Sequence, residues 1–338
     1  MKATYISSPT NLLYYSSLKN SDARILLCGN AKYYITDSRF ILTAQKELSN
    51  YYTVVLSDKL PLVKKSIEII NQLNVNILAV EGEALSMLEY LMLEQSLKNI
   101  TIVDDSEKIN EKRVQKRKNE IINIEKAQEI TDCIYLEVIQ TLFEGITEKE
   151  LAILINKKIF ENNCTPAFDT IVAFGENSAC PHAIPSNKKL QAGDAVIIDF
   201  GVKYNNYCSD MTRSFSYKFA TTEYEKIYNN VLNAQSAAIK NIRPGVEAKE
   251  LDCIARNSLG IYQKYFIHSL GHGVGLDIHE KPRLSTKSND ILKKNSIITI
   301  EPGVYIENKF GIRLEDLIVV QQQGIRNLTN AHKNMIIR

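Results

Sequence analysis

Asp199 and Asp210 form the first of two acidic pairs whose residue type and spacing could hold metal ions. They lie in runs rich in apolar and β-branched residues, on either side of the polar segment Tyr204-Asn-Asn206. Two such runs joined by a polar turn predict a β-hairpin. Folding at the turn would place the two carboxylates across from each other on one face. Like charges in that arrangement are destabilising, so the pair needs a cation between its members.

Glu301 and Glu315 repeat this arrangement around Asn308-Lys309. His272 lies between the two acidic pairs in the sequence, within the glycine-rich segment Gly271-His-Gly-Val-Gly275. Four carboxylates and one imidazole supply five oxygen and nitrogen ligands, which suits a pair of divalent metal ions. The residues around the acids are too apolar for solvated strands, and a buried carboxylate must be paired, hydrogen-bonded or metal-bound. The sequence therefore predicts a metal-dependent hydrolase.

Three more histidines are candidates for the same site. His182 lies in a turn-like segment before the first hairpin, His268 stands four residues before His272, and His279 follows seven residues after it. Taken singly, each could equally be a surface or structural residue. The glycines around His272 argue against a regular helix there and suit a close approach of the backbone to a ligand. We expect His332 to lie on the surface.

The elements that must hold these residues fall into two predicted domains. Strand-like and helix-like runs alternate over the first hundred residues, which predicts an α/β domain over residues 1–110. A polar stretch at 104–110 marks the expected boundary with a second domain at 111–338. In the first domain we expect strands at 24–28, 33–36, 52–56, 76–80 and 100–103, and helices at 38–48, 61–73 and 83–97.

The second domain is predicted to be α+β. Apolar spacing predicts a long helix over 112–143, and Thr147-Glu-Lys-Glu150 is the signature of a capping box at the start of another. Two further helices, one opened by Thr222-Glu-Tyr-Glu225 and one after Pro244-Gly245, separate the hairpins. Helices and hairpins thus alternate in two similar halves, without a visible repeat in the residues. An antiparallel sheet with helices on one side would accommodate this order.

Composition excludes several classes of function. A net charge of +2 over 338 residues gives no electrostatic case for nucleic acid, and the basic run at 112–118 is expected to be a solvated helix face. Six cysteines without paired spacing predict free buried thiols in a reducing compartment. The chain has no apolar run of membrane-spanning length, so we expect a soluble, cytoplasmic protein without membrane association. The glycine-rich segment lacks the helix that a dinucleotide fingerprint requires.

The motifs together resemble those of the pita-bread (M24-type) metallopeptidases, most closely the Xaa-Pro aminopeptidases and Xaa-Pro dipeptidases (prolidases). Their order is unbroken over the whole second domain. The first domain is similar to the creatinase-type leading domain of that family, notably at Tyr34-Ile-Thr-Asp-Ser-Arg-Phe40. The matching motifs are Pro181-His182, Ile198-Asp-Phe-Gly201, Ser209-Asp-Met-Thr-Arg213, Gly271-His-Gly-Val-Gly-Leu-Asp-Ile-His-Glu280, Ile300-Glu-Pro-Gly303 and Gly311-Ile-Arg-Leu-Glu-Asp316.

The resemblance implies a role for each candidate residue. Two divalent ions would be held by Asp199, Asp210, His272, Glu301 and Glu315, with Asp210 and Glu315 bridging them. His182 and His279 would sit over the scissile bond, and His268 would wall the pocket for proline. Arg313 would orient a ligand carboxylate.

Hydrolysis of Xaa-Pro bonds is the activity that the resemblance implies. A water shared by two divalent ions has its pKa lowered from about 15.7 toward roughly 7, which makes hydroxide available to attack the peptide carbonyl. Glu301 is the candidate for carrying the proton to the leaving nitrogen, while His182 and His279 would stabilise the oxyanion and position the substrate. We expect Mn²⁺, with Co²⁺, Fe²⁺ and Zn²⁺ as alternatives. A homodimer is expected from the resemblance.

Other activities remain as alternatives. A methionine aminopeptidase would use similar ligands, although the leading domain and His268 argue against it. A creatinase-like C–N hydrolase shares the fold without the metal ligands. A non-catalytic peptide-binding module would be expected to lose ligand acids, and this sequence has all of them. The residues leave open whether dipeptides or longer peptides are the substrate.

Overall fold

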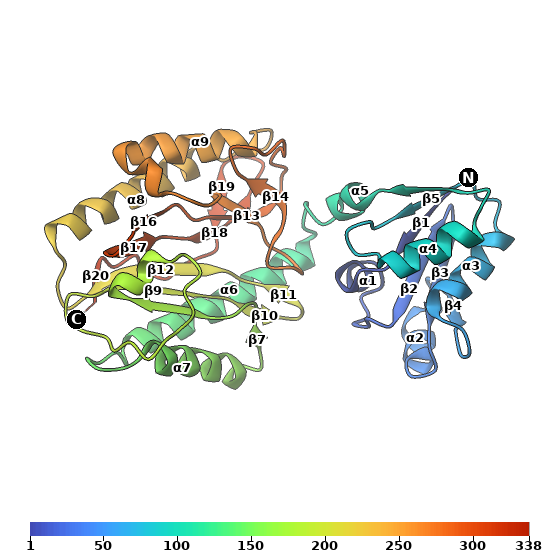
Figure 1. The fold of residues 1–338 in the computed structure, drawn as a ribbon, viewed down its shortest axis with the longest axis horizontal. Coiled ribbons are helices and arrows are strands. Elements are labelled where there is room, and N and C mark those ends of the chain that lie inside the picture. Colours follow the sequence, from blue (N-terminus) through green and yellow to red (C-terminus); the bar gives the residue numbers. More distant parts are fainter. Residues whose placement is uncertain (338) are drawn as a thin grey trace. The chain divides into compact units, whose positions relative to one another are not determined.

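The chain forms two compact units, and each mixes helices with sheets, as Figure 1 shows. The computed structural model describes residues 1–337. The first unit spans Met1–Lys112, and the second begins at Arg113. This combination of elements confirms the predicted α+β class.

A six-stranded sheet forms the centre of the first unit. Its strand order is β4-β3-β2-β1-β5-β6, with β1 to β3 antiparallel and the outer strands parallel to their neighbours. The strands are β1 (Lys2–Ile6), β2 (Ala23–Cys28), β3 (Ala31–Thr36), β4 (Thr53–Leu56), β5 (Ile77–Val80) and β6 (Thr101–Asp104). The helices are α1 (Pro9–Ser16), α2 (Ile41–Leu48), α3 (Leu62–Gln72), α4 (Met87–Ser96) and α5 (Ser106–Glu111).

The predicted strands and helices of this unit are all present, but β1, α1 and α5 were not predicted. A start signal for α1 is visible in the sequence, because Ser8 precedes a proline at the first helical position. The Ser8 side chain accepts a hydrogen bond from the Asn11 amide at 3.2 Å, as expected for an N-cap. Neighbouring residues such as Ile25 and Leu26 belong to two different hydrophobic clusters, so both faces of the sheet are covered.

The second unit contains two helix pairs with strands between them (Figure 1). Its first half consists of α6 (Lys118–Ile139), α7 (Glu148–Glu161), β7 (Thr165–Pro166), β8 (Ile171–Phe174), the 3₁₀ helix η1 (Gly175–Ala179), β9 (Ala195–Phe200), β10 (Val202–Tyr204), β11 (Tyr207–Cys208) and β12 (Met211–Tyr217). Its second half consists of α8 (Thr222–Lys240), α9 (Ala248–Leu259), η2 (Gly260–Tyr265), β13 (Gly271–Gly273), β14 (Glu280–Leu284), β15 (Ile297–Ile300), β16 (Gly303–Ile306), β17 (Phe310–Arg313), β18 (Asp316–Val320), β19 (Ile325–Asn327) and β20 (Ile336–Ile337).

Each helix pair packs on the strands of its own half. Residues of α6 and α7 share a buried cluster with β8, β9 and β12, while α8 and α9 share another with β15 and β18. The main sheets have the orders β20-β12-β9-β8 and β14-β13-β15-β18-β19. The two halves therefore present two sheets, and each carries one of the acid-bearing hairpins.

The two halves do share a short sequence repeat, which the reading of the sequence missed. Gly145-Ile-Thr-Glu-Lys-Glu-Leu151 and Gly245-Val-Glu-Ala-Lys-Glu-Leu251 each lead into the second helix of their pair. In both, the glycine has a positive φ, 100° and 88°, and its amide donates to a leucine carbonyl further along the chain at 2.8 Å. The turn requires a glycine with positive φ, whereas many different residues can form the apolar face of a helix. The repeat is therefore confined to the turn.

Helix starts in this unit follow the capping rules in part. Thr147 and Glu150 exchange the two hydrogen bonds of a capping box, at 2.8 and 3.1 Å, which confirms the prediction for α7. For α8 the cap is Thr221 rather than Thr222, since its hydroxyl accepts from the Tyr224 amide at 3.2 Å. The helix predicted from residue 112 begins only at Lys118.

The interpretation of the basic run 112–118 as a solvated helix face is wrong. Arg113 and Lys116 are only 7% and 2% exposed, and they precede α6. Their burial is possible because each pairs with an acid of the same unit. The charge pattern alone could not reveal these partners, since the acids lie far along the chain.

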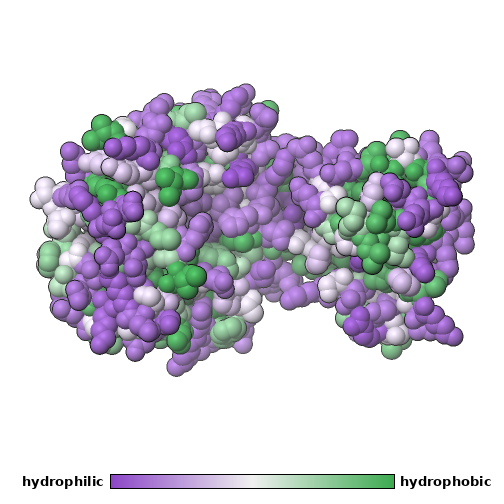
Figure 2. Space-filling view, viewed as in Figure 1, coloured by the Kyte–Doolittle hydropathy of each residue, from purple (hydrophilic) through white to green (hydrophobic). Residues whose placement is uncertain are grey.

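Surface features agree with the modest net charge. Hydrophobic residues are interspersed with hydrophilic ones on the face drawn in Figure 2. Over residues 1–337, no helix combines the length and the apolarity needed to cross a bilayer. All six cysteines are free, as predicted, but Cys133, Cys180 and Cys253 are exposed rather than buried.

Candidate metal centre

The hairpin that carries the first acidic pair turns at Asn205 and Asn206. Both residues have positive φ, 47° and 70°. This combination is typical of a two-residue type I′ turn, whose twist matches that of the strands it joins. Tyr204 pairs with Tyr207 across the turn. The polar centre noted in the sequence therefore closes the hairpin.

The two acids of this hairpin lie on one face but are not directly opposite each other. Asp199 on β9 is paired with Thr212 on β12. Continuing the same register places Asp210 at the level of Gly201, two rungs nearer the turn. Alternate rungs share a face, so the carboxylates are diagonal neighbours. The prediction of direct opposition is thus wrong for this pair.

Glu301 and Glu315 do face each other across the second hairpin. Ile300 pairs with Asp316 in the ladder of β15 and β18, and Gly303 pairs with Arg313 in the ladder of β16 and β17, nearer the turn. The two ladders keep one register, so the glutamates lie opposite each other in the interruption between them.

The interruption lets the second hairpin bond to neighbouring segments. The amide of Glu315 donates to the carbonyl of Thr212 on β12 at 3.1 Å, and the amide of Glu301 donates to the carbonyl of Leu270 at 2.8 Å. The first bond joins the two hairpins and brings Glu315 beside the first acidic pair. The second brings Glu301 beside the segment that leads to His272.

The five residues expected to bind metal are brought together in one cluster, with Asp199, Asp210 and Glu315 buried and His272 and Glu301 half-buried. Ligand atoms of Asp210, His272 and Glu315 all lie within 4.8 Å of one another. The Nε2 atom of His272 is 3.5 Å from Asp210 Oδ2 and 3.2 Å from Glu301 Oε1. Asp199 is tied to the same cluster through Arg313, described below. Sequence positions 199 to 315 thus converge on one site.

The imidazole of His272 is oriented by its surroundings. Its Nδ1 lies 3.1 Å from the carbonyl oxygen of Gly273, to which an Nδ1–H can donate. In that tautomer the lone pair of Nε2 is available to accept a proton or to bind a metal. Thr299 supports both partners, because its hydroxyl accepts from the His272 amide and donates to Glu301 Oε1, each at 3.1 Å.

Arg313 and Thr212 hold two of the carboxylates in place. The buried guanidinium donates from Nη2 to Asp199 Oδ2 at 2.6 Å and from Nε to the Thr212 hydroxyl at 2.9 Å. That hydroxyl in turn donates to Glu315 Oε2 at 2.8 Å. One oxygen of each carboxylate is thereby fixed, and the other is left for a further partner.

A cation fits this cluster on two observations. Asp199 Oδ1 is buried and has no hydrogen-bond partner, which is costly for an ionised oxygen. The four carboxylates are within electrostatic reach of one another and of the single guanidinium of Arg313. If all four were ionised and His272 were neutral, three negative charges would be uncompensated. Divalent ions would supply both the missing partner and the missing charge.

The pKa values of the acids show the same imbalance. Burial raises the pKa of Asp199, Asp210 and Glu315, most strongly for the last two, and the charges of neighbouring carboxylates raise it further for Asp210 and Glu315. Without metal, these acids therefore tend to keep their protons. A divalent ion would compete with those protons for the same oxygens.

Glu301 differs from the other three acids because His272 lies against it. Burial acts to raise the pKa of Glu301, but the hydrogen bond and charge of His272 lower it to about 2. Burial likewise acts to lower the pKa of His272, but Glu301 raises it. Each residue therefore favours the charged form of the other, across a distance of 3.2 Å between His272 Nε2 and Glu301 Oε1.

The three other candidate histidines surround the cluster. The ring of His279 lies 4.4 Å from that of His272 in an edge-on arrangement, and burial together with the charge of His272 lowers the pKa of His279. His182 is exposed on the loop after η1, and Arg313 Nη1 donates to the carbonyl of the preceding Pro181 at 3.2 Å. His268 is held by Tyr305, as its Nε2 lies 2.9 Å from the tyrosine hydroxyl.

Tyr305 was missed in the sequence, although it links two candidate residues. Its hydroxyl accepts a hydrogen bond from Arg313 Nη1 at 2.6 Å and is therefore left to donate to His268 Nε2. His268 Nδ1 then carries the proton and lies 2.8 Å from the carbonyl of Ser269. Burial lowers the pKa of His268, which favours this neutral form. The position of Tyr305 four residues after Glu301 was the only signal available.

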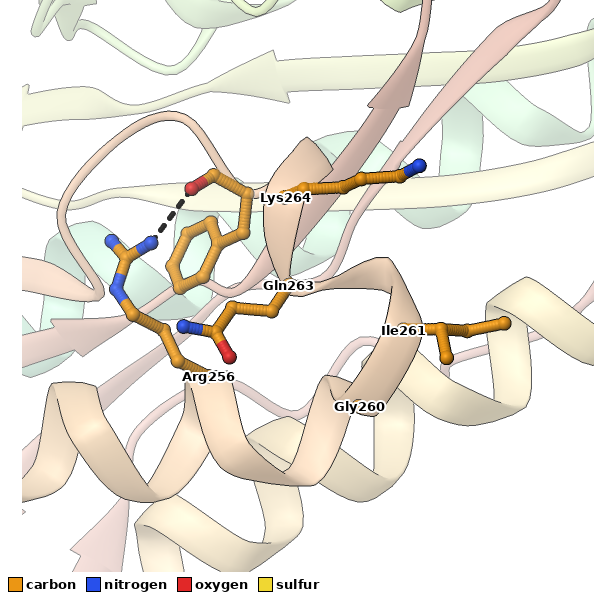
Figure 3. A pocket seen from close by; sticks show the side chains of 6 residues that line it. Arg256, Gly260, Ile261, Gln263 and Lys264 are labelled. Carbon is orange, nitrogen blue, oxygen red and sulfur yellow. Dashed lines mark hydrogen bonds between the residues drawn. The ribbon is translucent and has the colours of Figure 1, made fainter.

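Asp252 and Arg256 of α9 were also missed, and they fix the segment that carries His268. Figure 3 shows the side chain of Arg256 projecting from the helix toward the segment that follows it, with a dashed line to a backbone carbonyl. It donates to the carbonyls of Phe266 at 2.7 Å and His268 at 2.6 Å, while its Nε bonds Asp252 at 2.6 Å. Asp252 accepts from the Leu270 amide at 2.9 Å as well. The backbone on both sides of His268 is thus tied to α9.

Comparison with protein families finds two matches that together cover most of the chain. Residues 122–322 match metallopeptidase family M24, and residues 1–115 match the creatinase/prolidase N-terminal domain. The first match contains all nine candidate residues. The fold of both units is therefore that of a creatinase-type leading domain followed by a pita-bread domain.

Known relatives cover nearly the whole chain. The Xaa-Pro dipeptidase of Pyrococcus furiosus is 37% identical over 341 residues, covering 98% of this chain and 94% of the relative. Among solved structures, the X-Pro aminopeptidase of Thermotoga maritima has a TM-score of 0.91 at 34% identity, covering 100% of this chain and 98% of that one. The Xaa-Pro dipeptidase of Bacillus anthracis has a TM-score of 0.95 at 29% identity, covering 99% and 95%.

Proposed function

Because the chain belongs to metallopeptidase family M24, we propose that it hydrolyses Xaa-Pro peptide bonds with two divalent metal ions. The observation that carries the proposal is the cluster of four carboxylates and one imidazole, in which Asp199 Oδ1 lacks any partner. The relatives named as Xaa-Pro dipeptidases support the substrate class.

In this proposal Asp210 and Glu315 would each supply ligand oxygens to both ions, as bridging residues. Their position supports this role, because Asp210 and Glu315 both have ligand atoms within 4.8 Å of His272, and Glu315 shares the hydroxyl of Thr212 with the arginine that holds Asp199. Asp199 would complete one ion site, and His272 with Glu301 would complete the other. Arg313 would keep Asp199 Oδ2 occupied, which would leave Oδ1 available as a ligand.

The ions, when bound, would lower the pKa of a coordinated water to roughly 7 and so supply a nucleophile at neutral pH. The residues around the ions would transfer the proton, stabilise the oxyanion and position the substrate. Glu301 would accept a proton and deliver it to the leaving proline nitrogen. His279 and His182 would donate hydrogen bonds to the developing oxyanion and position the substrate.

His268 would form one wall of the proline pocket. Its neutral form, fixed by Tyr305 and by burial, presents an uncharged ring suited to a pyrrolidine. The backbone bonds from Arg256 would keep that wall in place. The leading domain, residues 1–110, contains none of the candidate residues, so the proposal assigns the chemistry to residues 111–338.

Mn²⁺ is the ion we propose, because it suits an oxygen-rich set of ligands with one imidazole. Structural zinc sites instead favour cysteine and histidine ligands. Co²⁺, Fe²⁺ and Zn²⁺ are the alternatives. We also propose a homodimer and a cytoplasmic location. The six free cysteines support a reducing compartment.

Three substrates test the proposal. The protein is stripped with chelator, reloaded with Mn²⁺, and assayed with Ala-Pro, Ala-Pro-Ala and Met-Ala-Ser. We expect hydrolysis of at least one of the proline peptides and none of Met-Ala-Ser, with activity lost in chelator. Preference for Ala-Pro would identify a dipeptidase, and preference for Ala-Pro-Ala an aminopeptidase. Cleavage of Met-Ala-Ser alone would refute the proposal in favour of a methionine aminopeptidase.

Two variants test the bridging assignment. Asp210→Ala and Glu315→Ala should each abolish metal binding and peptidase activity, because each would remove a ligand of both ions. Metal content measured by mass spectrometry and hydrolysis rates for each variant check this. Full activity in either variant would refute the bridging role.

A further inference from the structure

Residues 113–117, which we call the strap, connect to α6 but are not part of it. The amide of Lys116 donates to the carbonyl of Asn295 at 3.0 Å, and the side-chain amide of Gln115 donates to the carbonyl of Lys294 at 3.1 Å. Residue 295 stands two positions before β15. The strap is thereby fixed to the turn that opens the strand leading to Glu301.

Lys116 is buried against Glu280, the residue that follows His279. The two side chains form an ion pair and are only 1% and 3% exposed. Glu280 also fills the space beside Gly275, where an added Cβ would lie 2.3 Å from its Oε1. Its carboxylate is therefore enclosed between the strap and the glycine-rich loop.

Arg113 contacts the acid that precedes His279 in the sequence, as Lys116 contacts the one that follows it. Its Nη1 donates to Asp277 Oδ2 at 2.8 Å and lies 3.7 Å from Glu280 Oε2. Asp277 stands two residues before His279, and Glu280 one residue after it. Two cations of the strap thus hold the acids that flank His279 on both sides.

His279 itself is exposed at the metal centre, with its ring beside that of His272. The direction of an exposed side chain follows from its backbone. The ion pairs of the strap with Asp277 and Glu280 hold that backbone at the start of β14.

We infer that the strap is a positioning element for His279: Lys116 and Arg113 fix residues 277–280 so that the imidazole stays over the metal centre. This inference rests on the proposed function, because that function gives His279 its contact with the substrate. A buried ion pair could also serve stability alone, since removal of one partner leaves an uncompensated charge. The experiment must separate these two roles.

A double-mutant cycle separates them. Lys116→Met and Arg113→Gln are each made alone and in a His279→Ala background, with Ala-Pro and Ala-Pro-Ala as substrates. A displaced catalytic group lowers the rate by about 10-fold to 100-fold. We expect that loss in kcat for the single variants, with KM and metal content nearly unchanged. In the His279→Ala background the same substitutions should lower kcat less than about 2-fold.

Arg113→Gln keeps the cycle informative if Lys116→Met does not fold, because its partner Asp277 is 40% exposed. Lys126→Met is the matched control. Lys126 pairs with Glu129 on α6 at 3.0 Å, with both side chains 51% exposed, and its substitution should leave kcat unchanged. Losses that multiply fully in the His279→Ala background would overturn the inference.

A second readout does not depend on activity. The chain has five histidines, so their imidazole ¹H–¹³C signals in the metal-free protein can be assigned by single substitutions. Lys116→Met or Arg113→Gln should shift or broaden the His279 signal and leave that of His332 in place. An unchanged His279 signal would overturn the inference. A wild-type protein inactive on both proline peptides would refute the proposed function, even where the His279 signal still responds to the strap.

Discussion

Replacing Thr212 by valine removes a single hydroxyl from the metal centre while keeping a β-branched side chain of similar shape. Thr212 is fully buried. Its hydroxyl donates to Glu315 at 2.8 Å and accepts from Arg313 at 2.9 Å. The variant would leave a buried carboxylate without its donor and a buried guanidinium nitrogen without its acceptor. Both groups are charged, so neither loss is compensated by the methyl group.

The size of the effect follows from these two bonds. A hydrogen bond to a charged group contributes about 1.5–3 kcal/mol to stability. For a unit of this size, each kcal/mol shifts the melting temperature by roughly 2–4 °C, so losing both bonds, about 3–6 kcal/mol, lowers it by about 6–24 °C. Loss of a group that orients a metal ligand costs about 10-fold to 100-fold in metal affinity, equivalent to about 1.4–2.7 kcal/mol.

Competition with a chelator of known affinity measures metal binding, and thermal unfolding measures stability. Thr212→Ser is the matched control, because it keeps the hydroxyl and removes only a methyl group. We expect Thr212→Val to lose metal affinity by the factor above, while Thr212→Ser retains most of it. Equal metal affinity in the valine variant and the wild type would show that the Thr212 hydroxyl does not orient a metal ligand. So would an equal loss in the serine variant.

Three further predictions address other parts of the site. His279→Ala should keep its metal but lose most of its turnover; a collapse of metal content would show that His279 is a ligand instead. Burial raises the pKa of Asp210 and Glu315 in the metal-free fold, so the stability they contribute is present below their unfolded pKa values near 4 and is lost as pH rises. In chelator the melting temperature should therefore fall from pH 5 toward pH 8, less steeply in Asp210→Asn, and an equal slope in that variant would contradict the assignment. Arg256→Ala should loosen the segment around His268 and raise KM for Ala-Pro roughly 10-fold, given the charged hydrogen bonds lost, and an unchanged KM would exclude a role in the proline pocket.

Local patterns predicted much of the fold. The strands and helices of the first unit were visible as alternating runs, and the asparagines at 205 and 206 marked a turn that requires positive φ. The Thr147 capping box placed the start of α7 correctly. These features depend on neighbouring residues, so the sequence contains what decides them.

Register across the sheets could not be read in the same way. The offset of Asp199 from Asp210 follows from a turn of two residues rather than from a centred polar segment. The bond from the Glu315 amide to Thr212 joins residues 103 positions apart. Thr212 and Tyr305 were missed for this reason, because neither has a distinctive residue type and only their contacts give them a role.

The burial of the basic run 112–118 also depends on contacts that are distant in the sequence. Its charges and period are those of a solvated helix face, yet Lys116 pairs with an acid 164 residues away. Charge patterning describes what a segment prefers when nothing covers it. A distant carboxylate enclosed by a glycine loop can reverse that preference.

The proposed function requires that four carboxylates and one imidazole hold two metal ions in common. Diffraction from crystals grown with Mn²⁺, collected at its absorption edge, locates the ions directly. We expect two anomalous peaks about 3.5–4 Å apart, with oxygens of both Asp210 and Glu315 bonded to each. A cluster that stays empty at saturating Mn²⁺, or two ions that share neither acid, would contradict the proposed function.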